Sequence, residues 1–368
     1  ETGLVISKKR SSQFQYPAIL KSNKHVYMQM CFLGQGSFGA VIHYQQCSTF
    51  KNVAVKILAT NNGIRESKML DKIKCADPDK NNLLKLVEHF SLGLQHCIVF
   101  EKLDQDVFHF MSKRNRKPME VSEIRPIAQQ ILVALNALKS MGLAHTDIKP
   151  DNLMLVNHAT HPFKVKLIDF GLARNISDLK RTSQIQAMGY RAPEAVFGLP
   201  MNESVDMWSL GCSLVFMYFF KHLYPRTSEY EYIATIVRMA IGTIDNVLYD
   251  HKKCRYYSQM QSTISHGDSL KLKDVTEFES LLKQMLCVNS KNRITPEEAL
   301  KHNFISMNHL SKRPLCTKSI LTGSESVVGR SAGPNLPAAA STFSLLTEDV
   351  VMGVSSTAKK QALLYNNQ

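Results

Sequence analysis

Hydrophobic and polar residues alternate at the start of the regularly patterned part of this 368-residue chain. Apolar residues at every second position, Val26, Met28, Met30 and Phe32, predict a β-strand, and the run that begins at Val41 predicts a second strand. Three more runs have the length and composition of strands: residues 53–58, 83–90 and 97–101. We therefore expect an antiparallel sheet of five strands, in which order begins near residue 26.

After residue 104 the apolar spacing changes from two residues to about 3.6, which is typical of helices. Val107 and Met111 begin one helix, residues 124–138 form a longer helix that ends at Gly142, and residues 210–220 predict a buried helix. This last run is too short to cross a membrane. The pattern predicts an α+β fold, with a small lobe of five antiparallel strands and one helix followed by a large, mostly helical lobe.

The composition divides the chain into three parts. Residues 1–26 are a polar lead that we expect to be flexible, and residues 27–310 are the folded domain, with a small lobe at 27–103 and a large lobe at 104–310. Residues 311–368 are rich in Ser, Thr, Ala and Gly without periodicity. Such a composition predicts a disordered tail.

Charge and cysteine content narrow the possible partners. The formal net charge of +14 favours anionic ligands such as nucleotides. Direct nucleic-acid binding is not expected, because no stacking motif or compact basic helix accompanies the charge, and no membrane partner is expected. The eight cysteines show no CxxC spacing. This predicts reduced, buried thiols in an intracellular protein of the nucleus or cytoplasm, not a zinc site or a set of disulfides.

Residues 145–171 contain the groups that phosphoryl transfer requires. Asp147 can accept the proton of a hydroxyl group, and Lys149 can neutralise charge on the transferred phosphoryl group. Asn152 and Asp169 offer the hard oxygen ligands that magnesium prefers. An Asp or Asn before a strand can also simply cap a turn. The four groups together nevertheless predict a catalytic centre.

Residues 33–41 read Leu-Gly-Gln-Gly-Ser-Phe-Gly-Ala-Val and predict a phosphate-binding loop. Gly34, Gly36 and Gly39 have no Cβ, so their backbone can approach phosphates closely. A GxGxxG motif can also open a dinucleotide-binding fold, in which a helix follows the glycines. Here a strand follows from Val41, so a hairpin that covers a nucleotide is the better interpretation.

Lys56 lies inside the apolar run of residues 53–58, where an unpaired buried charge would be costly. Glu66 shares a helical face with Leu70 and therefore points inward, which predicts an ion pair between Lys56 and Glu66. Only ten residues separate the two, and they include the Asn-Asn-Gly sequence at 61–63. We expect a break there and a helix that is trimmed at its start.

These motifs resemble the catalytic core of a eukaryotic protein kinase. Within the kinases the sequence is similar to the homeodomain-interacting protein kinases, beside the dual-specificity tyrosine-regulated kinases of the CMGC group, over roughly residues 27–310. The likeness rests on residues 149–156 (Lys-Pro-Asp-Asn-Leu-Met-Leu-Val), 190–194 (Tyr-Arg-Ala-Pro-Glu), 198–200 (Gly-Leu-Pro), 206–212 (Asp-Met-Trp-Ser-Leu-Gly-Cys) and 223–225 (Leu-Tyr-Pro).

This resemblance implies a bilobal protein kinase fold with ATP and Mg²⁺ as cofactors. It also implies protein substrates with serine or threonine hydroxyls, and it makes transcription regulators candidate partners. The catalytic residues would be Asp147, Lys149, Lys56 and Glu66, and the metal ligands Asn152 and Asp169. Phe100 would be the gatekeeper beside the adenine, and the nucleotide would be bound by Leu33, Gly34, Gln35, Gly36, Ser37, Phe38, Gly39, Ala40, Val41, Ala54, Lys56, Glu101, Leu103 and Met154.

Several positions depart from the pattern of these kinases. Thr146 replaces the arginine common before the catalytic aspartate, and Gln184 falls where this subfamily autophosphorylates a tyrosine, so we predict that this phosphate does not order the activation segment. Met188 and Gly189 stand where an arginine and a tyrosine would be expected. Because that arginine helps to shape the pocket for a proline after the target residue, the sequence leaves a preference for proline open. Leu172 is the kind of residue associated with serine preference.

Two functions of different classes follow from these residues. The complete set of Lys56, Asp147, Asn152 and Asp169 favours an ATP- and magnesium-dependent serine/threonine protein kinase. The altered activation segment and the short connection to Glu66 favour a catalytically quiet kinase fold that acts as a scaffold. In either case the kinase large lobe would typically contain a buried ion pair, here between Glu194 and Arg293.

Overall fold

The computed structural model describes residues 16–36, 39–181, 184–241 and 269–310. The predicted tail and most of the predicted lead therefore lie outside the described residues. The chain forms two compact units, one from residues up to 117 together with 129–174, and one from residues 118–128 together with those from 175 onward. Each unit has a hydrophobic core of its own.

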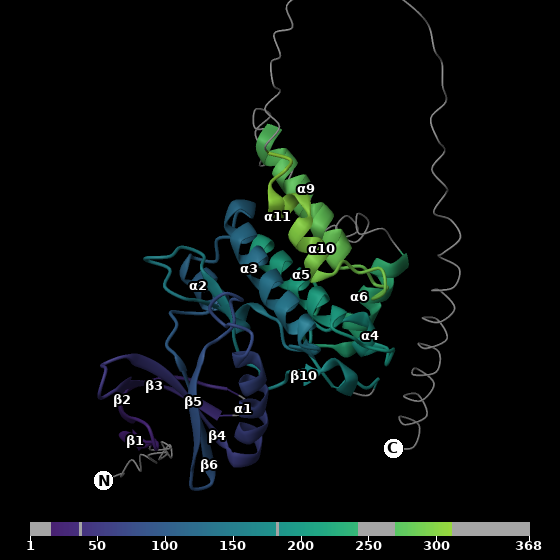
Figure 1. Cartoon of the computed structure of the whole chain (residues 1–368). Coiled ribbons are helices and arrows are strands. Elements are labelled where there is room, and N and C mark those ends of the chain that lie inside the picture. The colour runs from purple at the N-terminus through teal and green to yellow at the C-terminus, as the bar shows by residue number, and fades with distance from the viewer. Residues whose placement is uncertain (1–15, 37–38, 182–183, 242–268, 311–368) are drawn as a thin grey trace, which may run out of the picture. The chain divides into compact units, whose positions relative to one another are not determined.

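A six-stranded antiparallel sheet forms much of the first unit (Figure 1). In spatial order its strands are β1 (Ile19–Lys21), β2 (Val26–Gln35), β3 (Gly39–Gln46), β4 (Asn52–Ala59), β6 (Gln95–Glu101) and β5 (Leu86–Leu92). Lys56 of β4 pairs with Val41 of β3 on one side and with Ile98 of β6 on the other. The lysine therefore lies in the middle of the sheet, as its apolar neighbours predicted.

The predicted number of strands was too low by one. The additional strand, β1, lies in the segment that we expected to be a flexible lead, and it pairs Ile19 with Met28 of β2. Leu20 is 1% exposed and packs in the core of the sheet with Tyr27 and Tyr44. A strand of three residues is too short to show an alternating pattern, so it was not recognised in the sequence.

The alternating apolar residues of β2 predict the strand correctly, but they lie on its exposed side. Met28, Met30 and Phe32 are 48%, 49% and 53% exposed. Tyr27, in contrast, is fully buried, and its hydroxyl donates a hydrogen bond of 2.6 Å to Glu88. A period of two indicates strand geometry, but which face is covered depends on the elements that pack against the sheet.

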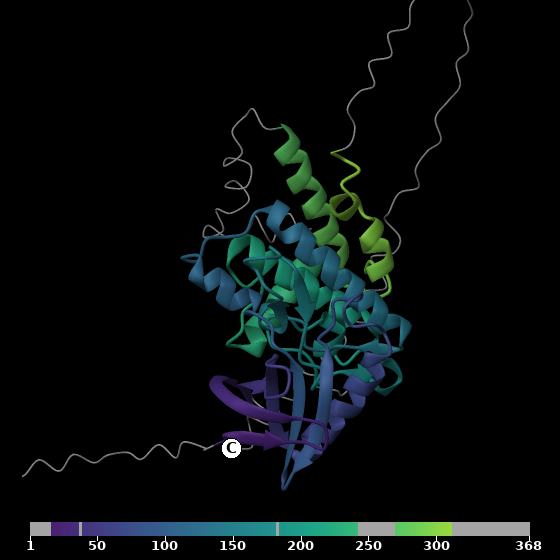
Figure 2. The ribbon, with the colours of Figure 1, turned by 60° about the vertical axis from the view of Figure 1, so that its left-hand side comes forward.

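The helix that carries Glu66 is α1 (Thr60–Lys74), and it follows β4 without a connecting loop. The expected break at residues 61–63 was wrong, because these residues form the first turn of α1 and Gly63 is buried there. The first turn of a helix has backbone N–H groups without helical partners, so polar residues such as Asn are tolerated at this point. The helix packs against β4, β5 and β6 (Figure 2).

The rest of the first unit supplies the loops of the site. The predicted helix at Val107 is α2 (Val107–Lys113), and Asp106 caps it by accepting a hydrogen bond from the backbone N–H of His109. The long predicted helix is α3 (Val121–Ser140), of which residues 129–140 belong to the first unit and residues 121–128 to the second. It is followed by Gly142, which has a φ of +68°. After it come β7 (Leu143–Ala144), the short 3₁₀ helix η1 (Pro150–Asn152), β8 (Leu153–Leu155) and β9 (Val165–Leu167).

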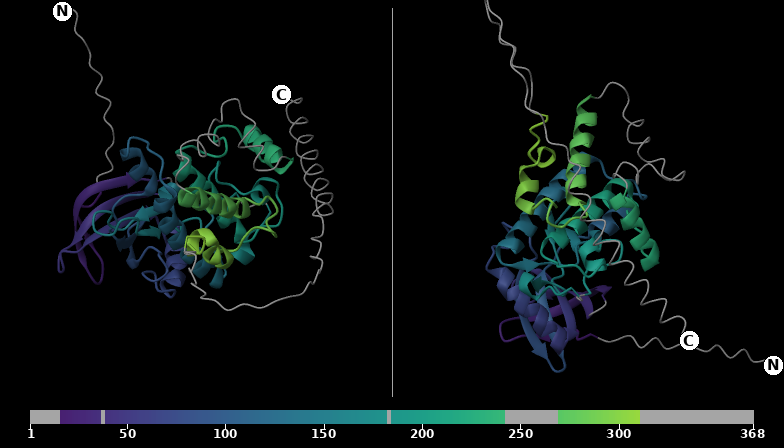
Figure 3. Two further views of the ribbon diagram at one scale, coloured as in Figure 1. Left: turned by 90° about the horizontal axis from the view of Figure 1, so that it is seen from above. Right: turned by 90° about the vertical axis from the view of Figure 1, so that its right-hand side faces the viewer.

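The second unit is mainly helical. Its central helix α5 (Ser204–Phe219) contains all but the last residue of the predicted buried run 210–220, and its residues 205–217 are all buried. Near the end of the described residues two short helices follow each other, α10 (Pro296–Lys301) and α11 (Asn303–Ser306). They are separate because His302 has an extended backbone and its side chain caps the second of them. Figure 3 shows α9 beside these two helices, and α9 also contacts α5. The elements from residue 174 onward are β10 (Arg174–Asn175), η2 (Ile176–Asp178), α4 (Pro193–Val196), α5 (Ser204–Phe219), α6 (Glu229–Ile241), α9 (Ser269–Met285), α10 (Pro296–Lys301) and α11 (Asn303–Ser306).

The cysteines are less buried than the sequence predicted. Of the six described cysteines, Cys31, Cys47 and Cys75 are exposed, because each lies on the outward side or at the end of its element, and Cys97 and Cys212 are buried. All six are free thiols. Within the described residues, none of the helices combines the length and the hydrophobicity that a membrane crossing would need.

Candidate nucleotide-binding and catalytic site

Three charged side chains that are distant in the sequence meet in the first unit. Lys56 Nζ lies 2.8 Å from Glu66 Oε1 and 2.8 Å from Asp169 Oδ1, so the predicted ion pair with Glu66 is present and a second carboxylate joins it. A Cβ atom on Gly171 would lie 3.2 Å from both Asp169 Oδ1 and Glu66 Oε2. This close approach explains why a glycine suits the second position after Asp169.

Burial and charge act in opposite directions on these groups. Burial disfavours the ammonium of Lys56, but the two carboxylates outweigh it and raise the pKa of Lys56. Burial also disfavours the charge on Asp169, but Lys56, the backbone N–H of Gly171 and His145 together lower its pKa. For Glu66, burial exceeds the effect of Lys56, and the pKa of its carboxyl is raised. Asp169 is thus the carboxylate that stays charged most readily.

The catalytic loop has its own set of hydrogen bonds. Asp147 Oδ2 accepts hydrogen bonds from Lys149 Nζ and from Asn152 Nδ2, both at 2.9 Å. Asn152 Nδ2 also donates to the backbone carbonyl of Asp147 at 2.7 Å. His145 and Phe170 are buried and their rings pack edge to face. The loop therefore holds the carboxylate of Asp147 in one orientation.

The hairpin of β8 and β9 links this loop to Asp169. The strands pair Leu153 with Leu167, and the N–H of Ile168 donates to the carbonyl of Asn152 at 3.0 Å. Asn152 and Asp169 are therefore brought to the same end of the hairpin. Both carry hard oxygen atoms, and in the described part of the chain Nδ2 of Asn152 makes the hydrogen bonds to the loop, which leaves Oδ1 free of them.

This donor set suits magnesium. The described residues contain no group of three or more His, Cys, Asp and Glu side chains that could hold a metal. Mg²⁺ rarely needs such a group, because it keeps several waters and is usually bound by one or two carboxylates together with substrate phosphates. Here the side-chain oxygens of Asn152 and Asp169 would hold Mg²⁺.

A cavity of about 460 Å³ opens beside Lys56 and Asp169. Phe100, the expected gatekeeper, lines it. The expected nucleotide-binding residues that line it are Leu33, Gly34, Gln35, Gly36, Val41, Ala54, Lys56, Glu101, Leu103 and Met154. Most of the set that the sequence nominated is thus brought to one place.

The remaining nominated residues fall elsewhere. Ala40 does not line the cavity, because it is 1% exposed and packs in the core of the sheet. Gly39 is in β3, and its carbonyl accepts a hydrogen bond of 2.8 Å from the N–H of Gly36. Ser37 and Phe38 lie outside the described residues.

Several lining residues were not nominated from the sequence. Only Asp106 carries a recognisable signal, since an Asp before the first apolar residue of a helical pattern is a typical N-cap. Gln105 is brought to the cavity by backbone pairing, because the N–H of Leu155 donates to its carbonyl at 2.8 Å. The additional lining residues are Leu84, Lys102, Asp104, Gln105, Asp106, His109, Lys113, Asp151 and Ile168.

The side chain of Glu101 contacts residues outside the cavity. Its Oε1 lies 2.6 Å from Nζ of the buried Lys166 and accepts the backbone N–H of Lys85 at 2.9 Å. Lys166 Nζ also lies 2.6 Å from Asp79. The hydrogen bonds from Lys166 and Lys85 lower the pKa of Asp79 to about 2. The buried cation of Lys166 thereby fixes the side chain of Glu101, a residue that lines the cavity.

Comparison with known proteins now decides the family. A family model described as protein kinase domain matches residues 27–305. The chain belongs to the protein kinase family.

The curated relatives of this kinase include several homeodomain-interacting protein kinases. Homeodomain-interacting protein kinase 2 of Mesocricetus auratus is 34% identical over 349 residues, which covers 81% of this chain and 30% of the relative. Homeodomain-interacting protein kinase 1 of Caenorhabditis elegans is 32% identical and covers 77% of the chain and 40% of the relative. Homeodomain-interacting protein kinase 4 of Mus musculus is 30% identical, and the match covers 80% of this chain and 57% of the relative. The chain thus spans about a third of the length of the first of these relatives.

Neutral hydrogen bonds hold the activation segment, residues 169–194, near both of its ends. In the first unit, Thr146, which replaces an expected arginine, donates from Oγ1 to the carbonyl of Leu172 at 2.7 Å. In the second unit, buried Gln186 donates from Nε2 to the carbonyl of Val205 at 2.8 Å and to Ser209 Oγ at 2.7 Å. These contacts need no phosphate.

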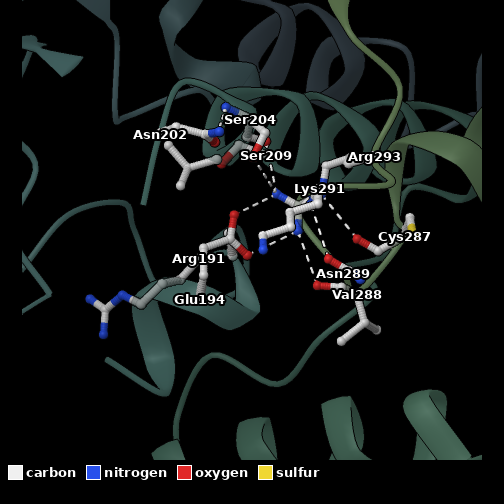
Figure 4. A network of polar contacts seen from close by, with 12 residues as sticks. Arg191, Glu194, Asn202, Ser204, Ser209, Cys287, Val288, Asn289, Lys291 and Arg293 are labelled. Carbon is white, nitrogen blue, oxygen red and sulfur yellow. Dashed lines mark hydrogen bonds and ion pairs between the residues drawn. The ribbon is translucent and has the colours of Figure 1, made fainter. Parts of the chain in front are cut away.

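The segment ends in the predicted ion pair of the second unit (Figure 4). Arg293 Nη1 lies 2.6 Å from Glu194 Oε1, and Nη2 lies 2.9 Å from Oε2, so the pair is bidentate. Arg293 also donates to the carbonyls of Ser204 and Cys287 at 2.9 Å and 3.0 Å. Its guanidinium carbon lies 5.2 Å from the ring centre of Trp208. Four acceptors and an aromatic face thus compensate for the burial of this cation.

Proposed function

We propose that this protein is an ATP- and magnesium-dependent serine/threonine protein kinase. The observation that carries the proposal is the position of Lys56 Nζ, 2.8 Å from both Glu66 and Asp169 and on the wall of the cavity. A lysine in this position presents a cation to nucleotide phosphates, and the two carboxylates fix where that cation lies.

The residues of the catalytic loop would perform the transfer. Asp147 would orient the substrate hydroxyl and accept its proton, and Lys149, 2.9 Å from Asp147, would offset charge on the phosphoryl group. Asn152 and Asp169 would hold magnesium, which supplies charge neutralisation at the phosphates when bound. Lys149 and Leu172 support a preference for serine or threonine acceptors through their likeness to kinases of that class.

The test is phosphate transfer from labelled ATP to a general protein substrate. Asp169→Ala should abolish incorporation, and Asp147→Asn should reduce it by about 10²–10⁴-fold, the usual contribution of a general base. Glu297→Gln, which removes an exposed carboxylate of α10, is the matched control and should leave the rate unchanged. Equal incorporation by the wild type and Asp169→Ala would eliminate the enzyme and leave the catalytically quiet scaffold.

We also propose that activity does not depend on a phosphorylated activation segment. The support is that Gln184 cannot be phosphorylated and that Gln186 and Thr146 hold the segment by neutral contacts. Phosphatase-treated protein, shown by mass spectrometry to carry no phosphate between residues 171 and 192, should keep its rate. Loss of activity on that treatment, with recovery on rephosphorylation, would contradict this proposal.

The names of the relatives suggest the class of partner. Their homeodomain-interacting designation supports transcription regulators as candidate substrates of this protein. Phosphorylation of purified homeodomain proteins, compared with an unrelated protein of similar serine content, tests this part of the proposal.

A further inference from the structure

A cysteine, a histidine and an asparagine form a hydrogen-bonded row on the sheet of the first unit. Cys31 of β2 and His43 of β3 are directly opposed in the strand register, and Cys31 Sγ lies 3.7 Å from His43 Nδ1. The other ring nitrogen of His43, Nε2, lies 3.0 Å from Oδ1 of Asn52, the first residue of β4. Three neighbouring strands therefore contribute one side chain each to this row.

Asn52 determines which nitrogen of His43 carries the proton. A carbonyl oxygen can only accept a hydrogen bond, so the neutral ring has its proton on Nε2 and donates it to Asn52. The lone pair of Nδ1 is then available to the thiol of Cys31, which donates to it. A nucleophile beside a base that a third group orients is the arrangement that activates a thiol for attack.

A second exposed cysteine of the same unit lacks such a base. Cys31 and Cys75 are both exposed, free thiols. Cys75 Sγ also lies 3.7 Å from its acceptor, but this acceptor is the backbone carbonyl of Asp71. A carbonyl oxygen accepts a hydrogen bond without removing the proton, whereas an imidazole nitrogen can take it. The two thiols therefore differ in the chemistry of the acceptor and share the donor distance.

The row lies on the face of the sheet that lines the cavity. His43 is directly opposite Ala54 of β4, and opposed residues of antiparallel strands point to the same face. Ala54 lines the cavity, and so does Val41, two residues before His43 on β3. A group attached to Cys31 would therefore be on the same face as these two cavity residues.

We propose that Cys31 is a site of reversible S-thiolation by low-molecular-weight disulfides such as glutathione disulfide, with His43 as the base. The thiol proton passes to His43 Nδ1, and the sulfur of Cys31 attacks one sulfur of the disulfide. A new S–S bond forms as the old one breaks, and the departing glutathione thiolate takes the proton from the imidazolium. One thiol and one disulfide thus give one mixed disulfide and one thiol.

The test compares two thiols within one protein. The full chain, reduced and then freed of reductant, is incubated with glutathione disulfide at pH 7, and peptide mass spectrometry follows the mixed disulfide at each cysteine over time. We expect Cys31 to react about threefold to tenfold faster than Cys75, because an ordinary thiol is only a few per cent ionised at pH 7 and the gain from the base exceeds the accompanying loss of nucleophilicity. Dithiothreitol should reverse the modification.

Variants of the other two members of the row separate activation from exposure. His43→Gln keeps a polar side chain without a base and should slow Cys31 to the rate of Cys75. Asn52→Ala removes the acceptor that orients the ring and should give an intermediate rate, whereas Asn52→Asp retains an acceptor and should keep at least the wild-type rate. Cys97 is buried in the core of the sheet, so it should stay unmodified in every variant and reports that the sheet is folded.

The outcomes decide the proposal separately from the proposed kinase function. Equal rates at Cys31 and Cys75 in the wild type would overturn it without any variant. An unchanged Cys31 rate in His43→Gln, with Cys97 still unmodified, would show that exposure alone accounts for the reaction. If His43→Gln exposes Cys97, the two Asn52 variants decide instead, and equal Cys31 rates in them would overturn the proposal. None of these measurements requires phosphate transfer.

Discussion

Replacement of Arg293 by Met should strongly destabilise the second unit. The side chains of Arg293 and Glu194 are 0% and 2% exposed, so the change leaves a buried carboxylate without its bidentate partner. It also leaves the carbonyls of Ser204 and Cys287 without a donor. Removal of one partner of a buried ion pair typically lowers the unfolding free energy by about 3–5 kcal/mol. We expect the loss in Arg293→Met to lie in this range.

The assay is urea unfolding followed by tryptophan fluorescence. Trp208 is the only tryptophan of the chain and is fully buried in the core of the second unit, so its emission reports on that unit. Lys301→Met is the matched control, because its ion pair with Glu297 is equally short at 2.7 Å but the side chains are 73% and 68% exposed. This exposed pair should contribute no measurable stability.

A double variant tests the reason for the loss. In Glu194→Gln with Arg293→Met, no buried charge remains, so the double variant should lose less stability than the two single changes added together, by about 0.5–3 kcal/mol. If Arg293→Met unfolds at the same urea concentration as Lys301→Met, the buried pair does not stabilise the unit. Strict additivity in the double variant would likewise refute the argument from an uncompensated charge.

Three further predictions follow from buried groups. Lys166→Met removes the cation between Asp79 and Glu101, so we expect severalfold weaker ATP binding by calorimetry, and unchanged affinity would show that Glu101 needs no such support. Gln186→Ala leaves several buried polar groups without a partner and should lower the unfolding free energy by about 1–3 kcal/mol in the same fluorescence assay. In the folded protein the pKa of His222 is lowered from 6.5 to about 4. Between pH 6.5 and pH 4 the folded state therefore binds fewer protons at this residue than the unfolded state does. The unfolding free energy should fall by about 1–3 kcal/mol as the pH drops over this range. His222→Gln should flatten this dependence, and an unchanged slope would contradict it.

The sequence by itself determined most of the elements and the partner of Lys56. Strands, helices and the order of the motifs follow from local periodicity, and Lys56 could be assigned a carboxylate partner because a buried lone charge is costly in any fold. Glu66 was found in this way, whereas the pair of Glu194 and Arg293 was expected from the resemblance to kinases, and the structure contains both ion pairs. The inference about Glu66 succeeds because it depends on a local pattern and on a physical requirement that holds in every protein.

Tertiary structure alone decided which faces are covered and which distant residues meet. The apolar stripe of β2 is exposed because Tyr27 on the other side fills the core, and the three-residue strand β1 exists because Leu20 reaches that core. Lys166 lies between Asp79 and Glu101, which are 87 and 65 residues away in the sequence. The contact of Gly189 with Arg226 is of the same kind, since neither residue has a local signal that indicates the other. Such contacts arise when packing brings separate segments together, and periodicity along one segment contains no information about its neighbour.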